Sequence, residues 1–436
     1  MTSLWRTLLS LSVVVLVSQP AVTLAANSIS GFTSAEHMVI GNSIKLYFAP
    51  HDPGQNGLPL SLPNGLNVTY GDIVSIGDFY EIPNQPVSQG QSDSERKARF
   101  LGAFNSFALN SGAANEATQI LDVIHKEKAT VDEAMKKGEK PEDVYKKIAF
   151  DLDRQFNCIT GGGCSTKTWW LTPGRYLTLA NEDYDHFGAN AWITYKTGHE
   201  LAMQVAVDAH QTADLKKLEV AYAMNAFACH FLTDRFASGH IRTPRTELPE
   251  STTPSLTGTL LSEYMHDEES VYGLHVHNQR GDRWMAYGDR SYYNQKNAAH
   301  ARIILETLQA SADQVFNAYQ TGNSQADKDL YDLIPQADEI NNTGKQDISP
   351  LFYWDNTTSK LMRRVDMANP YDRHWTDSWW GWSTLLELKR QHGITVGAQA
   401  ALALSDASER ALQDGLISDR YIAEYAKRKL TALTVS

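Results

Sequence analysis

The sequence predicts a mainly α fold, with several helices joined by long loops and a further helical region at the C-terminal end. Apolar residues recur at helical spacing, opposite charged faces, over six long stretches and over three more in the last hundred residues. Strand patterns are short and scattered. Glycines stand where helices should end, at Gly138, Gly322 and Gly415.

The expected helices follow a segment, residues 27–95, that is rich in Pro, Gly and Asn. They cover residues 94–110, 115–137, 141–156, 188–211, 213–236, 297–320, 377–391, 395–413 and 418–432. A polar stretch at 321–328 is either a boundary or a simple helix–helix loop. We therefore expect a main domain over 26–320 and a helical C-terminal region, 321–436, packed on it.

The composition bounds the class of protein. The 436 residues carry 39 Lys and Arg against 51 Asp and Glu, a net charge of −12, and 42% are apolar. Such a chain can bury a sizeable core and is not globally disordered. The acidic charge argues against a general nucleic-acid binder, because neutralising phosphates needs clustered Lys and Arg. It does not exclude an enzyme that binds phosphate through metal ions.

The first residues have the pattern of an export signal. Residues 1–25 hold Arg6, a short apolar run at 8–17, then Pro20 and small residues before an expected cleavage ahead of Ala26. A buried N-terminal helix is the alternative. We expect a secreted protein, and no later segment has the 18 uninterrupted apolar residues of a membrane span.

The cysteines fit an exported protein. Cys158 and Cys164 flank Ile-Thr-Gly-Gly-Gly, which is flexible enough to let them form a disulfide. A zinc knuckle fits less well, because five intervening residues exceed the usual ligand spacing. Cys229 lies in an apolar run and is expected to be a buried free thiol.

The sharpest metal-binding pattern is His230-x3-Asp234-x5-His240. His230 and Asp234 stand four apart in an expected helix and share one face. Gly239 should end that helix, so His240 can turn back toward it. Two imidazoles and a carboxylate suit a dication such as zinc. The alternative is an exposed helix end with incidental polar residues.

Weaker candidates precede this pattern. His37 and Asp78 each have a simpler structural interpretation when taken alone. His186 comes just before a helix start, and His199 is a ligand, a donor to a ligand or a core histidine.

Three further histidines follow the pattern. His266 stands beside three carboxylates, in either a solvated charged turn or the corner of a metal site. His275 and His277 alternate as on a strand, and either bind metal or lie at the surface.

In this order the pieces resemble the superfamily of zinc-dependent phospholipases C and fungal single-strand nucleases. They are most similar to a branch of secreted bacterial phospholipases C that hydrolyse phosphatidylcholine. Beside the central pattern, over about residues 30–300, the likeness rests on these stretches: Gly-Asp78-Phe-Tyr, Asp-His186-Phe-Gly, Gly-His199-Glu-Leu-Ala, Gly-His240-Ile-Arg-x-Pro-Arg, His266-Asp-Glu-Glu and Arg-Gly-Asp282-Arg-Trp-x-Ala-Tyr-Gly-Asp289.

The resemblance implies that residues 26–320 form a multi-helix, zinc phospholipase C-like catalytic domain with three zinc ions. One ion would be held by Asp78, His186, His230 and Asp234. A second would share Asp234 and add His37, together with the backbone at the start of the mature chain.

The third ion would take His240, His266 and a carboxylate. The family places that carboxylate four residues after its histidine, and here that position is Ser270. We expect Glu269 to serve instead, with two nearby alternatives, Asp267 and Glu263.

The resemblance also implies a reaction, in which metal-activated water attacks the phosphodiester of phosphatidylcholine and releases diacylglycerol and phosphocholine. Asp234 and Asp78 would be its catalytic carboxylates, Asp78 as general base or as orienter of a ligand. The ten Trp and nineteen Tyr offer side chains for anchoring at a membrane interface and for an aromatic choline site. The alternative is that these aromatic residues lie in the hydrophobic core.

We expect a phospholipid substrate, met in transient contact with a zwitterionic membrane surface, because the acidic charge opposes anionic lipid. We expect no nucleic-acid ligand and no obligate protein partner. The alternatives are a zinc-dependent single-strand nuclease or 3′-nucleotidase of the same superfamily, and a non-catalytic metal-stabilised binding protein.

Overall fold

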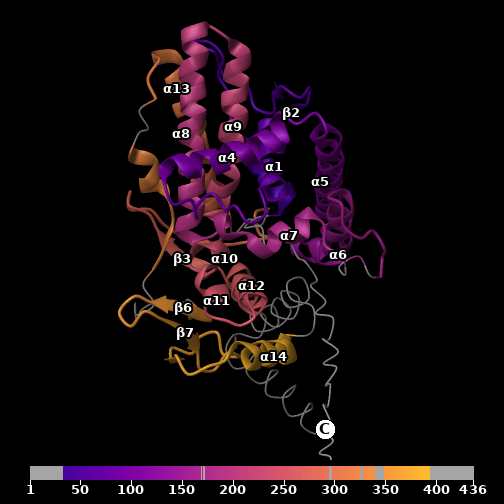
Figure 1. The fold of residues 1–436 in the computed structure, drawn as a ribbon, viewed down its shortest axis with the longest axis vertical. Helices are drawn as coiled ribbons and strands as arrows, with labels where there is room; N and C mark the ends of the chain where they lie inside the picture. Colours follow the sequence, from indigo (N-terminus) through magenta and orange to yellow (C-terminus); the bar gives the residue numbers. More distant parts are fainter. Residues whose placement is uncertain are drawn as a thin grey trace, which may run out of the picture.

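The computed structural model describes residues 33–167, 169, 172–293, 297–324, 328–338 and 348–392. The expected signal segment, 1–25, and the last two expected helices, 395–413 and 418–432, lie outside these ranges. Within them the chain is mainly helical, as predicted (Figure 1). Among the helices described, none has the length and apolar character needed to cross a membrane.

A pair of long neighbouring helices, α8 (Gly188–Thr212) and α9 (Leu215–Asp234), both predicted, stands side by side in the upper half of the view (Figure 1). The chain reverses between them within two residues, because Ala213 adopts a left-handed conformation with φ 50° and Asp214 caps α9. Every residue of α9 from Ala221 onward is buried. The central metal-binding pattern therefore lies inside the protein rather than at an exposed helix end.

Two other long helices of the main domain pack on this pair, since α13 contacts α8 and α9 and α4 contacts α8. α5 packs against α4 and α6 instead. Gly138 and Gly322 follow α5 and α13 with positive φ, as the sequence predicted. The bounds agree with the predicted ones to within a few residues: α4 (Asp93–Ala108), α5 (Ala113–Lys136), α6 (Pro141–Ile159) and α13 (Ala298–Thr321).

Short elements that the sequence did not predict bring N-terminal and middle segments onto α9. Capping boxes begin two of the helices, with Thr33 and Glu36 at α1 and Thr69 and Asp72 at α2. The short elements are α1 (Ser34–Asn42), β1 (Pro59–Ser61), β2 (Asn67–Thr69), α2 (Tyr70–Val74), α3 (Gly77–Tyr80), α7 (Arg175–Glu182) and the 3₁₀ helix η2 (Tyr184–His186). Because α1, α2 and α3 all contact α9, their polar residues are held close to its C-terminal end.

The acidic stretch around His266 belongs to a buried helix, α12 (Ser255–Tyr272). Of the two alternatives for this stretch, the solvated charged turn is therefore excluded. Burial of its carboxylates is tolerated because arginines reach them: Arg364 Nη2 lies 2.7 Å from an oxygen of Glu268. A run of acidic residues normally marks a surface, which is why the sequence did not predict this helix.

Two short helices precede α12 in the chain, and a small sheet follows it. β3 pairs with both β4 and β5 in an antiparallel sheet of order β4-β3-β5, and the strand predicted from His275 and His277 is β3. The bounds are α10 (Ser238–Ile241), α11 (Glu247–Glu250), β3 (Leu274–His277), β4 (Arg283–Ala286), η4 (Lys328–Leu333) and β5 (Gln336–Ala337).

The described part of the C-terminal region, residues 348–392, is a small sheet with one helix. The strands lie in the antiparallel order β6-β7-β8, and α14 confirms the helix expected at 377–391. The sheet was not predicted. The bounds are β6 (Phe352–Asp355), β7 (Lys360–Arg364), β8 (Trp375–Thr376) and α14 (Gly381–His392). This unit shares an apolar cluster with α12, formed by residues that include Leu260, Met265, Phe352, Leu361, Leu385 and Leu388.

The cysteines behave as predicted. Cys158 and Cys164 form a disulfide at the end of α6, and Cys229 is a buried free thiol. The Tyr70 hydroxyl lies 3.3 Å from the Cys229 sulfur. Burial raises the pKa of that thiol to about 11, so it is not a reactive group.

The buried pair of Arg364 and Glu268 fastens the C-terminal sheet to α12. Arg364→Leu should lower the free energy of unfolding by about 3–5 kcal/mol, because it leaves the Glu268 carboxylate buried without its partner. Lys360→Leu on the same strand is the control. It removes an exposed pair with Asp377 and should cost no more than about 1 kcal/mol. Denaturant unfolding measures both, and equal losses would contradict this role.

Candidate metal centre

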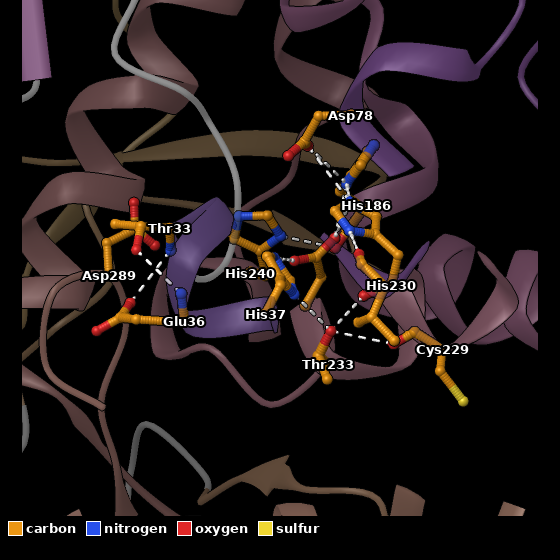
Figure 2. A network of polar contacts seen from close by, with 12 residues as sticks. Thr33, Glu36, His37, Asp78, His186, Cys229, His230, Thr233, His240 and Asp289 are labelled. Atoms are coloured by element: carbon orange, nitrogen blue, oxygen red, sulfur yellow. Dashed lines mark hydrogen bonds and ion pairs between the residues drawn. The ribbon is translucent and has the colours of Figure 1, made fainter. Parts of the chain in front are cut away.

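Separate elements bring five polar residues, which we call the first cluster, to the C-terminal end of α9 (Figure 2). His230 and Asp234 occupy the last turns of α9, His37 lies in α1, Asp78 in α3, and His186 ends η2. The structure thus gathers all five residues predicted for the first two ions. They are buried, apart from partial exposure of Asp78.

The close approach of α3 to α9 requires a glycine. A Cβ atom at Gly77 would lie 2.2 Å from Cγ of His230, which no side chain allows. Gly77 therefore lets the backbone reach the imidazole, and it places the next residue, Asp78, at the cluster.

Asp234 is the centre of the first cluster, and its two oxygens face different histidines. Oδ1 lies 3.2 Å from Nε2 of His37, and Oδ2 lies 2.6 Å from Nδ1 of His186 and 3.4 Å from Nε2 of His230. Asp78 Oδ1 lies 3.3 Å from Nε2 of His230 on the other side. Two sets of ligand atoms that could each hold a metal ion result: His37, His230 and Asp234, and Asp78, His186 and His230.

The ring nitrogens that point away from the cluster are tied to oxygen atoms. Nδ1 of His230 lies 2.8 Å from the Val74 carbonyl, which only accepts hydrogen bonds, so Nδ1 carries the proton. Nε2 of His186 lies 2.6 Å from Oε1 of Glu81 and donates to that carboxylate. In each ring the inward nitrogen is therefore the one available to bind a metal ion.

His37 is oriented in the same way by a hydroxyl. Its Nδ1 lies 2.7 Å from Oγ1 of Thr233, and that hydroxyl donates to the His230 carbonyl at 2.6 Å. Because the hydroxyl proton is used there, the oxygen accepts from Nδ1 of His37. Nε2 of His37 then presents its lone pair on the side of Asp234.

The cluster keeps negative charge inside the protein. Burial raises the pKa of Asp234, but His230 and His37 outweigh it and hold that pKa well below its usual value. Burial lowers the pKa of His186, but Glu81 and Asp234 hold it well above the ordinary range. Positive charge must balance these carboxylates, and a bound dication in place of the His186 proton would supply it.

A second cluster lies beside the first and consists of His240 from α10, His266 from α12, and Asp289, which follows β4. The ring centroids of His240 and His266 are 5.0 Å apart, and Nε2 of His266 lies 3.9 Å from Oδ1 of Asp289. Nδ1 of His240 donates to the His186 carbonyl at 2.7 Å, so its Nε2 is also a free ligand atom.

The predicted carboxylate Glu269 has one oxygen bonded to an arginine, whereas its Oε2 has no hydrogen-bond partner within the described residues. Its Oε1 accepts a hydrogen bond of 2.7 Å from Nε of Arg242. Asp267 contacts His266 at Nδ1, at 3.0 Å, on the edge of the ring away from Nε2. Burial raises the pKa of Glu263 well above its usual value, and the Asp267 charge raises it further.

The remaining histidine candidates lie outside both clusters. His199 is a core residue, with Nδ1 3.0 Å from the Asn225 amide and Nε2 2.9 Å from the Gln314 oxygen. His275 and His277 lie on β3, where Nδ1 of His277 is 2.7 Å from Asp338.

Sequence reasoning missed three side chains of the centre: Glu81, Thr233 and Asp289. Glu81 follows Asp78 by three residues, and Thr233 precedes Asp234, so short-range spacing around known candidates was a usable signal. Asp289 is separated from His240 by two helices and two strands, and only the fold places it.

No protein-family profile, curated protein or solved structure matches this chain. The geometry described above is therefore the ground for any functional conclusion. It shows buried His and Asp groups that could hold a metal ion.

Glu81 orients a metal ligand without being one. Glu81→Gln should weaken metal binding by about 10–100-fold, because an amide oxygen is a poorer acceptor for Nε2 of His186 than a carboxylate. The neighbouring Glu182→Gln is the control, because the Glu182 carboxylate bonds the Asn84 backbone and neither cluster. Competition with a coloured chelator measures both affinities, and an unchanged affinity in Glu81→Gln would refute the orienting role.

Proposed function

We propose that this protein is a zinc-dependent phospholipase C that hydrolyses phosphatidylcholine to diacylglycerol and phosphocholine. The observation that carries the proposal is the arrangement of imidazoles around Asp234. Each of their outward nitrogens is tied to an oxygen, and each inward nitrogen faces a carboxylate. Imidazole nitrogen with carboxylate oxygen is the donor set that suits zinc.

The residues present fit this group of ions. Buried polar atoms in both clusters have no hydrogen-bond partner within the described residues, among them Asp78 Oδ2, His240 Nε2 and Asp289 Oδ1. Leaving such atoms unsatisfied is costly, and a bound cation removes that cost. Zinc ions held here would neutralise charge on a phosphodiester and lower the pKa of bound water to near neutrality.

The side chains of the first cluster have distinct roles in this proposal. Asp234 belongs to the set with His37 and His230, and its other oxygen lies 2.6 Å from Nδ1 of His186 in the second set. Glu81 and Thr233 fix the rings of His186 and His37. Asp78 faces a small cavity that Tyr176 also lines, and there its carboxylate can accept a proton from water or a substrate group.

The C-terminal unit supports a lipid substrate. Large apolar side chains are exposed on residues 348–392, with Trp380 and Leu386 exposed by 65% and 62%, and Trp354 and Val365 to a lesser degree. Trp is favoured where protein meets the membrane interface. With a net charge of −12, contact with zwitterionic phosphatidylcholine is easier than contact with anionic lipid or nucleic acid.

The test is phosphocholine release from phosphatidylcholine vesicles by zinc-loaded protein. Asp234→Asn should lower turnover by at least about 10²–10³-fold, because it removes the carboxylate of one set of ligand atoms and weakens the contact with His186 in the other. Asp208→Asn, an exposed change on α8, is the matched control and should leave turnover unchanged. Circular dichroism checks that both variants keep their helix content.

The outcomes separate the alternatives. If the Asp234→Asn protein is folded and poor in zinc, yet turns over phosphatidylcholine as fast as the wild type, the proposal is contradicted. Zinc-dependent cleavage of single-stranded DNA without phosphocholine release would favour the nuclease. Bound zinc without hydrolysis of either substrate would favour a metal-stabilised binding protein.

A further inference from the structure

We infer that Asp289 is the carboxylate ligand that completes the second cluster, so that His240, His266 and Asp289 hold a metal ion of their own. This inference rests on the metal centre of the proposed function and names a ligand that the sequence resemblance did not give.

The three ligand atoms needed for such a site are present and buried. Nε2 of His240, Nε2 of His266 and Oδ1 of Asp289 all lack a hydrogen-bond partner within the described residues. Nδ1 of each ring is already used, by the His186 carbonyl and by Asp267 respectively. Three unsatisfied atoms of the kinds that bind zinc therefore belong to neighbouring residues, with Nε2 of His266 3.9 Å from Oδ1 of Asp289.

The packing around Ser270 explains why the carboxylate comes from another segment. Ser270 lies four residues after His266 on α12. A Cβ atom on Gly288 would lie 2.3 Å from Oγ and 2.6 Å from Cβ of Ser270. The backbone just before Asp289 thus fills the space that a longer side chain at position 270 would occupy. A small residue at 270 and a glycine at 288 together admit the segment that carries Asp289.

Glu36 then holds this segment in place. Its Oε2 accepts the Arg290 backbone N–H at 3.0 Å, and its Oε1 accepts that of Tyr292 at 3.0 Å. Glu36 is fully buried and directly precedes His37 in α1. One side chain therefore fixes the residues after Asp289 relative to the first cluster, so the position of Asp289 is determined by the fold rather than by a loose loop.

Glu269 is the competing ligand, and its contacts argue against it. One of its oxygens bonds Arg242, which also donates to the Ile348 carbonyl at 2.9 Å and so links α12 to the start of the C-terminal unit. Moving Glu269 to a metal ion would break the pair and leave a partly buried guanidinium without its carboxylate. Oε2 of Glu269 and Oδ1 of Asp289 both lack a hydrogen-bond partner within the described residues, but Glu269 would have to give up its pair with Arg242.

The experiment counts bound ions. Chelator-treated wild-type protein and variants are titrated with Zn²⁺ alone, and the zinc retained per chain is measured by mass spectrometry after gel filtration. Asp289→Asn should lose one ion per chain, or bind it at least about tenfold more weakly. Removing a ligand should lower the metal affinity by more than removing a residue that only orients a ligand. Glu269→Gln and the control Asp282→Asn, at a half-buried residue paired with Arg280, should keep the wild-type number.

A second variant tests whether the lost ion is the one at His240. His240→Ala should lose the same single ion, and the double variant with Asp289→Asn should lose no more than either single one. Co²⁺ in place of Zn²⁺ gives an independent spectroscopic readout of the same change. Should Asp289→Asn fail to fold, Asp289→Glu replaces it. That variant should keep the ion number and bind one ion more weakly, and an unchanged affinity would count against the inference.

The failures are distinguishable. If wild-type protein binds no zinc, the proposed function fails and this inference fails with it. If wild-type protein binds zinc and Asp289→Asn binds the same number with the same affinity, only the role of Asp289 is refuted. Loss of an ion in Glu269→Gln, with Asp289→Asn intact, would give the site to Glu269.

Discussion

A completely buried carboxylate at the end of α9 determines how the surrounding elements must lie. Asp234 is inaccessible to solvent, and its oxygens lie within 3.4 Å of His37, His186 and His230. An isolated buried charge would cost several kcal/mol, so the fold has to deliver compensating groups to this point. α1, α3 and η2 supply these groups, because each brings one side chain of the first cluster to the end of α9.

The compensating groups are themselves held by the protein. The outward nitrogen of each imidazole is hydrogen-bonded to the protein, by the Val74 carbonyl, Glu81 or Thr233. In each ring this fixes which nitrogen faces the cluster and so could bind a metal ion. A histidine buried only for packing, such as His199, instead has both nitrogens occupied by protein groups. The contrast within one chain separates candidate ligands from core residues.

Much of this arrangement could be predicted from the sequence, because it depends on short spacing. His230 and Asp234 share a helix face, and the helical periodicity of α8 and α9 placed that face in the core. Other parts depend on contacts distant in the chain. The acidic run in α12 resembles a surface turn until Arg364 and Arg242 are brought to it, and Asp289 becomes a candidate only when Gly288 packs on Ser270. Neither pairing leaves a periodic signal.

Anomalous diffraction from crystals of the zinc-loaded protein, recorded on both sides of the zinc edge, tests the central claim most directly. The account predicts anomalous peaks at the first cluster, within about 2.0–2.2 Å of Asp234 oxygens and of the inward nitrogens of its histidines. Absence of any peak there, with His186 still bonded to both Glu81 and Asp234, would show that a proton rather than a metal ion balances the buried carboxylates, and would contradict the account.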